Sequence, residues 1–171
     1  RFSEVLEGYI SPNPDDNYID LTGYYVLPGL IDMHVHLTNQ SSNRAYLERI
    51  TLNAADYAIR ATKNAEKTLM AGFTTVRNLG DSDSITISLR NAINNGIVIG
   101  PRIFSSGKTI SSTGGHGDST NSLNQRLTSD LGPKDGVMNG ELDALKSERY
   151  RYKENADLIK ITATGGVLSN A

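Results

Sequence analysis

Cysteine is absent from the 171 residues, and no run of about 18 consecutive apolar residues occurs. The missing cysteines exclude disulfide frameworks, thiol nucleophiles and cysteine-ligated zinc, so a metal site must use histidine, carboxylate or a less usual ligand. The missing apolar run disfavours a membrane span. Seventeen basic and 19 acidic residues give a net charge of −2, which provides no basic surface for nucleic acid or anionic lipid. We therefore expect neither a nucleic-acid nor a membrane partner.

Both ends of the sequence resemble cuts through a longer chain. It begins with Arg1 instead of methionine and stops at Ala171, shortly after a Gly-Gly turn. We expect a parent polypeptide of roughly twice this length or more, since a complete eight-stranded α/β barrel takes about 250 residues. A cytoplasmic location is expected, while a signal peptide upstream would make the protein secreted or periplasmic.

Segments rich in Val, Ile and Thr alternate along the chain with segments of helical period, which predicts an α/β fold with parallel strands. Two short antiparallel strands are expected first, at 18–21 and 24–27 around a Thr22-Gly23 turn. The expected parallel strands begin at Leu30 (LIDMHVHL) and cover 73–78, 102–106 and 157–164. Between them we expect a helix over 43–71 ended by Gly72, a helix capped by Asp83 or Ser84 and ending at Asn95-Gly96, a long loop over 107–140, and a helix over 141–155 with Leu142, Leu145 and Tyr152 inward.

Four parallel strands correspond either to half of an eight-stranded barrel or to most of a doubly wound sheet. The doubly wound alternative usually carries a glycine-rich phosphate-binding fingerprint after its first strand. Here that position reads HVHLTNQSS, and the chain contains no G-x-G-x-x-G. The pattern therefore favours the N-terminal half of a (β/α)₈ barrel.

The strand from Leu30 carries Asp32, His34 and His36 at period two, so their side chains share one face. His34 and His36 would lie about 7 Å apart at their Cα atoms, twice the rise of about 3.3 Å, and two imidazoles so placed can hold one divalent ion. They also fall at the carboxyl end of the strand, where parallel barrels assemble active sites. The alternative is that one histidine is hydrogen-bonded within the barrel and the other lies in the loop.

Lys160 interrupts the apolar strand LIKITAT, in which Leu158, Lys160 and Thr162 share a face. A lysine buried there would have its pKa lowered by desolvation. One interpretation is an ion pair with a carboxylate elsewhere in the fold. The other is that its neutral amine reacts with CO₂ to give a carbamate, which bridges two metal ions as a carboxylate would.

His116 lies in the glycine-rich run Thr113-Gly-Gly-His-Gly-Asp118, which could place the imidazole over the barrel mouth against a substrate. The alternative is a solvated histidine in a mobile turn. Gly107-Lys108-Thr109 superficially matches a phosphate-binding loop, but Arg102 stands where that motif needs glycine, so nucleotide binding is discarded. Arg77 is expected in an ion pair at the barrel rim. Asp32 is expected to have a structural role or to orient a ligand imidazole.

Four motifs together resemble the amidohydrolase superfamily, and within it the imidazolonepropionase-related branch that contains Xaa-Pro dipeptidases. They are VLPGLIDMHVHL, GFTTVRNLGD, GPRIFSSGKTISSTGGHGD and ADLIKITATGGVLS. The first motif identifies the superfamily, the lysine strand adds the subtype with two metal ions, and the other two indicate the prolidase-like subgroup. The resemblance runs from about Tyr18 to Ala171.

The resemblance implies a (β/α)₈ barrel with a small β-sandwich domain, residues 1–26 being a remnant of the sandwich and 27–171 the first half of the barrel. It implies that His34 and His36 bind metal, that carboxylated Lys160 bridges two ions, zinc being expected, and that His116 lies near the substrate's carboxylate. The same pattern requires two further histidines and a general-base aspartate, which we expect beyond residue 171.

The function implied is metal-assisted hydrolysis of a C–N bond in a small molecule or dipeptide, and most specifically an Xaa-Pro dipeptidase. Other amidohydrolases acting on cyclic amides or Xaa-Arg dipeptides stay open as alternatives. A deaminase of the same superfamily would hold one metal ion and would not need Lys160. A metal-free scaffold homologue is the alternative outside the enzymes. Family barrels often form homo-oligomers, but no interface can be identified in the sequence.

Overall fold

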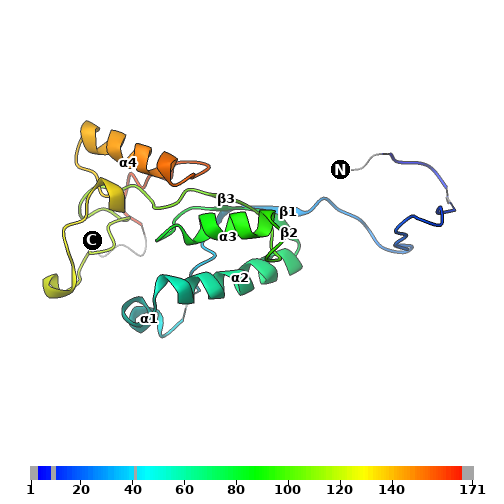
Figure 1. Ribbon diagram of the computed structural model, residues 1–171, viewed down its shortest axis with the longest axis horizontal. Helices are drawn as coiled ribbons and strands as arrows, with labels where there is room; N and C mark the ends of the chain where they lie inside the picture. Colours follow the sequence, from blue (N-terminus) through cyan, green and yellow to red (C-terminus); the bar gives the residue numbers. More distant parts are fainter. Residues whose placement is uncertain (1–3, 9–10, 41, 167–171) are drawn as a thin grey trace.

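The structure is a computed structural model that describes residues 4–8, 11–40 and 42–166. Strands and helices alternate along it as the sequence predicts, which confirms the α/β class (Figure 1). The elements are β1 (Leu30–Val35), α1 (Ala45–Thr51), α2 (Ala54–Met70), β2 (Phe73–Asn78), α3 (Ile85–Asn94), β3 (Arg102–Ser105), two single-turn 3₁₀ helices (Gln125–Leu127 and Pro133–Asp135) and α4 (Glu141–Lys153). Within the described ranges the three strands form one parallel sheet in the order β1-β2-β3.

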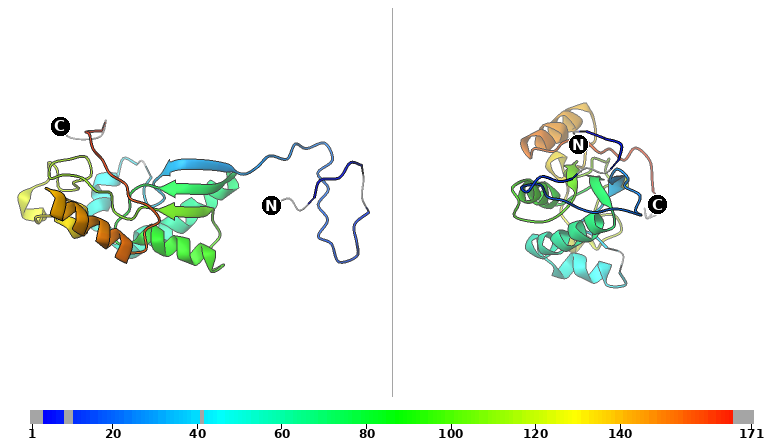
Figure 2. Two further views of the ribbon diagram at one scale, coloured as in Figure 1. Left: turned by 90° about the horizontal axis from the view of Figure 1, so that it is seen from above. Right: turned by 90° about the vertical axis from the view of Figure 1, so that its right-hand side faces the viewer.

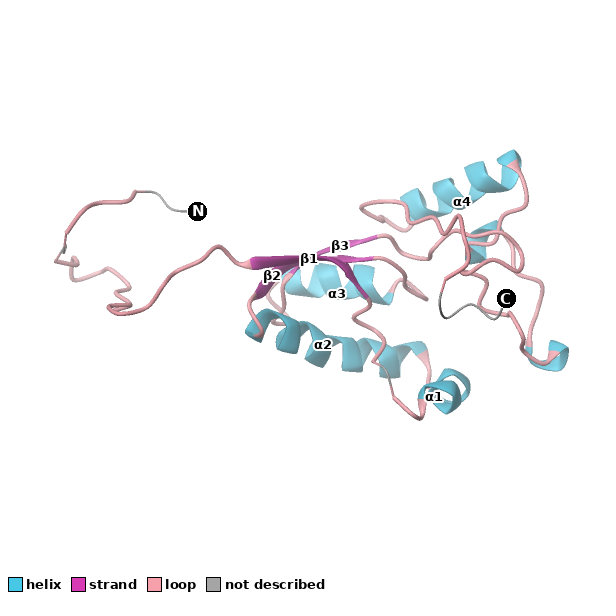
Figure 3. Cartoon of the chain, turned by 180° about the vertical axis from the view of Figure 1, so that it is seen from behind, coloured by secondary structure: helices cyan, strands magenta, loops and turns pink. Residues whose placement is uncertain are grey.

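Helices α2 and α3 cover one face of this sheet, and α4 lies beyond the carboxyl ends of the strands (Figures 1 and 3). The contact between sheet and helices is apolar, and Ala61 and Ala65 are completely buried, so small side chains let α2 lie close to the sheet. The cluster consists of Leu37, Ala61, Ala65, Val76, Ile85, Leu89 and Ile103. Burial of this cluster fixes the sheet against α2 and α3, and it thereby fixes the positions at which the residues following each strand begin.

The single helix predicted over 43–71 is wrong, because the chain forms α1 and α2 with an interruption between them. Leu52 is extended, and Asn53 begins a new helix, with its backbone N–H donating to the Asp56 carboxylate at 2.9 Å. Gly72 ends α2 as predicted, with a backbone φ of +95° that residues other than glycine rarely adopt.

The two strands predicted at 18–21 and 24–27 are also wrong. Only the turn between them forms, closed by a 2.9 Å hydrogen bond from the Tyr24 amide to the Leu21 carbonyl. This segment extends away from the sheet (Figure 2), so it has no neighbouring strand to complete a ladder. The division into residues 1–26 and 27–171 stays a prediction.

The strand predicted over 157–164 appears only as one isolated parallel bridge between Ile110 and Ile161. The Ile110 amide donates to the Lys160 carbonyl at 2.8 Å, and Ile110 accepts from Thr162 at 2.9 Å. The segment begins beside β3, where the amide of Asp157 donates to Ser105 and its carboxylate accepts from the Ser105 amide, both at 2.8 Å. It thus runs parallel to β3 and its continuation without becoming a regular strand.

Helix α4 forms close to the predicted range, but its orientation differs from the prediction. Leu142 and Tyr152, expected to face inward, are 75% and 84% exposed. Ser147 and Arg151 are completely buried instead. The polar face of α4 therefore packs on the loops, because its side chains bond to loop carbonyls: Ser147 to Pro133 and Arg151 to Lys134.

Candidate metal centre and substrate pocket

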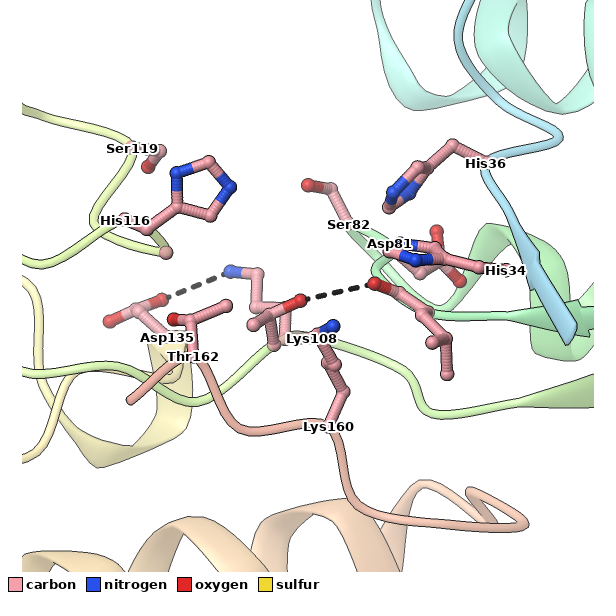
Figure 4. Close-up of a pocket in the computed structure, with 13 residues that line it drawn as sticks. His34, His36, Asp81, Ser82, Lys108, His116, Ser119, Asp135, Lys160 and Thr162 are labelled. Carbon is pink, nitrogen blue, oxygen red and sulfur yellow. Dashed lines mark hydrogen bonds and ion pairs between the residues drawn. The ribbon is translucent and has the colours of Figure 1, made fainter. Parts of the chain in front are cut away.

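A cavity of about 220 Å³ lies past the carboxyl ends of the strands, between the sheet and the loops that follow it (Figure 4). All four site residues singled out in the sequence line it: His34, His36, His116 and Lys160. They come from three separate segments of the chain. The structure thus brings these residues together, as the strand pattern predicts.

The imidazoles of His34 and His36 lie side by side, with ring centroids 5.2 Å apart and planes inclined at 62°. Strand alternation produces this pairing, because Val35 between them packs against the apolar cluster on the other face. Asp32 steadies the strand end by accepting a 2.9 Å hydrogen bond from the backbone amide of His34. Its carboxylate therefore holds the backbone of His34 and has a structural role.

His36 lies against Gly80, where a side-chain Cβ would come within 3.1 Å of the ring. Burial lowers the pKa of His36, and a hydrogen bond to the Gly80 backbone acts in the opposite direction. The positive charges of the other two histidines and Lys160 lower the pKa further. The lowered pKa favours the neutral imidazole, which is the form that coordinates a metal ion.

Lys160 is half-buried, so the prediction of a buried lysine in a regular strand is wrong. Its backbone is nevertheless anchored by the bridge to Ile110, and Thr162, on the same face, lines the cavity with it. The side chain rises from below the two histidines in Figure 4. The amine is therefore accessible to small molecules in the cavity.

The loop that carries His116 is held by hydrogen bonds, which argues against the alternative of a mobile turn. The Gly117 amide donates to Ser111 Oγ at 3.1 Å, and Asp118 accepts from the Gly114 amide at 2.9 Å. Gly166 passes so close that a Cβ there would lie 2.7 Å from the imidazole. His116 faces the cavity from the side opposite His34 and His36 (Figure 4).

Three further charged residues line the cavity without having been predicted: Asp81, Lys108 and Asp135. Burial raises the pKa of Asp81, although Thr86 donates both its amide and its hydroxyl to one carboxylate oxygen, at 2.7 and 2.8 Å. Lys108 Nζ lies 3.4 Å from an oxygen of Asp135. One feature of the sequence could have indicated Asp81 and Lys108. Both follow shortly after the end of a strand, where parallel folds place functional groups.

Arg77 does not form the expected ion pair in the described structure. Its Nε donates to the carbonyl of Met33 at 2.7 Å, so it joins β2 to β1 through the backbone. A second, larger cavity of about 990 Å³ adjoins the first and shares His36, Asp81, Ser82 and Ser119 with it. Within residues 4–8, 11–40 and 42–166, no three His, Cys, Asp or Glu side chains converge as a metal site.

Comparison with known proteins identifies the class. The profile of the amidohydrolase family matches residues 25–171, and the chain belongs to this family. The resemblance found in the sequence is thereby confirmed. In the described part of the chain, no helix is long and apolar enough to cross a membrane.

The relatives include a Xaa-Pro dipeptidase, a prolidase and an ochratoxinase. A solved Xaa-Pro dipeptidase with methionine in its active site is 50% identical, with a TM-score of 0.87, over 95% of this chain and 40% of that one. A prolidase complexed with N-methylphosphonate-L-proline is 34% identical, with a TM-score of 0.79, over 94% of this chain and 39% of that one. Ochratoxinase from Aspergillus niger is 27% identical over 84% of this chain and 32% of its own length. The chain thus spans about a third of that curated relative and two fifths of the solved ones.

Proposed function

We propose that the whole protein hydrolyses a C–N bond with two divalent metal ions, zinc being expected, and that its substrates are Xaa-Pro dipeptides. The observation that carries the proposal is the convergence of His34, His36 and Lys160 on one cavity. The similarity to a Xaa-Pro dipeptidase and to a prolidase supports the choice of substrate.

The donor set fits such a metal centre in part. His34 and His36 supply two imidazole ligands from one strand, and no carboxylate joins them to complete a group of three among the described residues. A carbamate on Lys160 would turn this pair into a three-donor set with one negative charge, which two adjacent cations need.

Carboxylation of Lys160 needs no reactant other than CO₂. The neutral amine of Lys160 adds to the carbon of CO₂, so that one N–C bond forms while one C=O π bond opens and its electron pair moves to the oxygen. The nitrogen then loses a proton to solvent, which leaves a carbamate with one negative charge. Lys160 lines the cavity, so a group added to its amine would extend into that cavity.

The residues divide the work between two sides of the cavity. On the strand side, His34, His36 and Lys160 would hold the ions, which when bound polarise the amide carbonyl and make water nucleophilic near neutral pH. On the loop side, His116 would lie near the carboxylate of the substrate. The surrounding backbone fixes these groups before substrate arrives, which lowers the entropy lost on reaching the reactive geometry.

Metal content tests the proposal directly. The full-length protein, produced with zinc and bicarbonate, is expected to contain close to two zinc ions per chain by elemental mass spectrometry. Lys160→Ala should lower this number, whereas Lys146→Ala, at an exposed position on α4, should leave it unchanged. A content near one ion would indicate the mononuclear deaminase type, and near zero would indicate a scaffold.

A substrate panel separates the remaining alternatives. We expect Xaa-Pro dipeptides to be hydrolysed faster than Xaa-Arg dipeptides and cyclic amides. Ochratoxin belongs in the panel because of the similarity to ochratoxinase. A clear preference for any of these over Xaa-Pro dipeptides would contradict the substrate assignment while leaving the metal-dependent hydrolase intact.

A further inference from the structure

Asn78, the last residue of β2, is completely buried and lines neither of the two cavities. Its side chain lies on the same face of β2 as Val76, which packs in the apolar cluster. Its carboxamide bonds to two backbone groups: Oδ1 accepts from the amide of Leu37 at 2.8 Å, and Nδ2 donates to the carbonyl of Gly80 at 2.8 Å. Asn78 therefore holds two separate segments at fixed positions from beneath the cavities.

Both of these segments adjoin His36, whose ring lines the cavity (Figure 4). Leu37 follows His36 directly, so the bond to its amide fixes the backbone of the histidine. Gly80 lies against the imidazole, since a Cβ there would come within 3.1 Å of Cε1 and 3.4 Å of Nδ1. The ring also hydrogen-bonds to the Gly80 backbone, and because this bond favours the protonated ring, the ring donates and the carbonyl accepts. One carbonyl oxygen thus receives both the imidazole and Asn78 Nδ2.

The orientation of the Asn78 carboxamide is fixed by its partners. The Leu37 amide can only donate and the Gly80 carbonyl can only accept, so turning the carboxamide over would oppose like groups at both contacts. Nδ2 also lies 3.3 Å from Oγ1 of Thr86, which is completely buried and in turn hydrogen-bonds to Ser105 Oγ at 2.8 Å. This chain of hydrogen bonds connects the carboxyl ends of all three strands.

We infer that Asn78 is a positioning residue, which fixes the orientation of His36 so that Nδ1 bonds to the Gly80 carbonyl and Nε2 is left for the cavity. This inference rests on the proposed function, which gives His36 a metal ion to bind. Nδ1 is the ring nitrogen on the edge that lies nearest Gly80, and a neutral ring with its proton on Nδ1 presents the lone pair of Nε2. A histidine held in this way keeps the tautomer and the direction that a metal ion needs.

The zinc affinity of the full-length protein tests the inference. Asn78→Leu keeps a side chain of similar size and removes both hydrogen bonds, and it should raise the dissociation constant for zinc about 10- to 100-fold. Val76→Ala is the matched control, because Val76 is completely buried on the same face of β2 and has an apolar side chain. It should lower stability and leave the dissociation constant unchanged. Competition with a chromophoric chelator measures the constant, on protein whose folding is verified by circular dichroism.

Histidine NMR on the zinc-free, full-length protein gives a second readout, which does not depend on metal. At about pH 8 an imidazole is neutral, and its ¹⁵N shifts distinguish the Nδ1–H from the Nε2–H tautomer. The signals of His36 are identified by their loss in His36→Gln. We expect the Nδ1–H tautomer in the wild type and in Val76→Ala, and a mixture of both tautomers in Asn78→Leu.

The two readouts separate this inference from the proposed function. An unchanged zinc affinity or an unchanged His36 tautomer in Asn78→Leu overturns the positioning role of Asn78. Absence of zinc binding by the wild type overturns the proposed function, and the tautomer of His36 then decides about Asn78 alone. If Asn78→Leu does not fold, Asn78→Ser, whose shorter side chain reaches at most one of the two partners, is measured in its place.

Discussion

Two regions of the molecule are held together by different interactions. The sheet–helix body, residues 30–40 and 42–105, consists of paired strands and helices around one apolar cluster. The loop region, residues 106–166, contains one long helix, two single-turn helices and two isolated bridges, Ile110 to Ile161 and Ser111 to Val137. In this region, hydrogen bonds between side chains and backbone groups add to the few backbone bonds of these bridges. The body therefore fixes the positions of the strand ends, and the loop region supplies the side chains that face these ends across the cavity.

The strongest test of this contrast is removal of the polar anchor of the loop region. Arg151→Leu leaves two loop carbonyls and the Glu154 carboxylate without their cation. We expect the free energy of unfolding to fall by about 4 kcal/mol, as for other broken buried charge contacts, measured by urea denaturation of the full-length protein. Arg149→Leu, exposed on the same helix, should change it by less than about 0.5 kcal/mol. Equal effects of the two substitutions would contradict the anchoring role.

The matching test of the body is a cavity in its apolar cluster. Ile103 on β3 is 3% exposed, and Ile103→Ala should lower the free energy of unfolding by about 3 kcal/mol. Ile103→Val, which removes one methylene group, should cost only about 1 kcal/mol. Hydrogen exchange should show the loss across the sheet–helix body. Loss of protection in the loop region alone would contradict the division of the molecule into these two regions.

Two aspartates allow the regions to be compared through pH. Burial raises the pKa of Asp118 in the loop region, but hydrogen bonds from Thr120 and Gly114 outweigh it and bring the pKa below its usual value. Its stabilising contribution is therefore present above about pH 3.8 and is lost as pH falls through the lowered pKa. Asp81 in the body has a raised pKa because of burial, so its contribution is full at low pH and is lost as pH rises through that pKa.

Replacement of each aspartate by asparagine should therefore give opposite pH dependences. The destabilisation caused by Asp118→Asn should grow with rising pH to about 1 kcal/mol near neutrality. The stability of Asp81→Asn relative to the wild type should instead improve as pH rises. Urea unfolding at several values between about pH 3.5 and 7 measures both. Slopes of the same sign would contradict the difference in environment.

The smallest effect is expected where the two regions meet at the surface. Arg49 on α1 donates to the carbonyl of Ser119 in the His116 loop at 3.0 Å, and both residues are exposed. Arg49→Gln should change global stability by less than about 0.5 kcal/mol. It should, however, increase hydrogen exchange of the amides around Ser119. Arg44→Gln, exposed immediately before the same helix, is the control and should change neither quantity.

The sequence predicted the body better than the loop region because the body follows periodic patterns. Alternation in LIDMHVHL placed His34 and His36 on one face, and the apolar period placed α3 correctly. The break between α1 and α2 was missed although Asn53 and Asp56 form a recognisable start signal. In the loop region, hydrophobicity predicted the wrong face of α4, since a buried arginine has no periodic signature.

The candidate site was predictable to the extent that it lies at strand ends. His34, His36, His116 and Lys160 converge on the cavity, whereas their roles stay predictions. The pairing of Lys108 with Asp135 was not predictable, because it joins residues 27 positions apart in a region without regular pairing. Such contacts depend on turn geometry that a single sequence does not reveal.

The double contact of Asp157 with the end of β3 restricts how the chain can vary in length. Asp157 clamps Ser105 through both its amide and its carboxylate, only three residues before Lys160. A single insertion or deletion between Asp157 and Lys160 would rotate the amine to the opposite side of the segment. The exposed residues around the 3₁₀ turn Gln125–Leu127 carry no such constraint. Homologues with loops of different length should therefore vary near that turn and keep the spacing of three before the lysine.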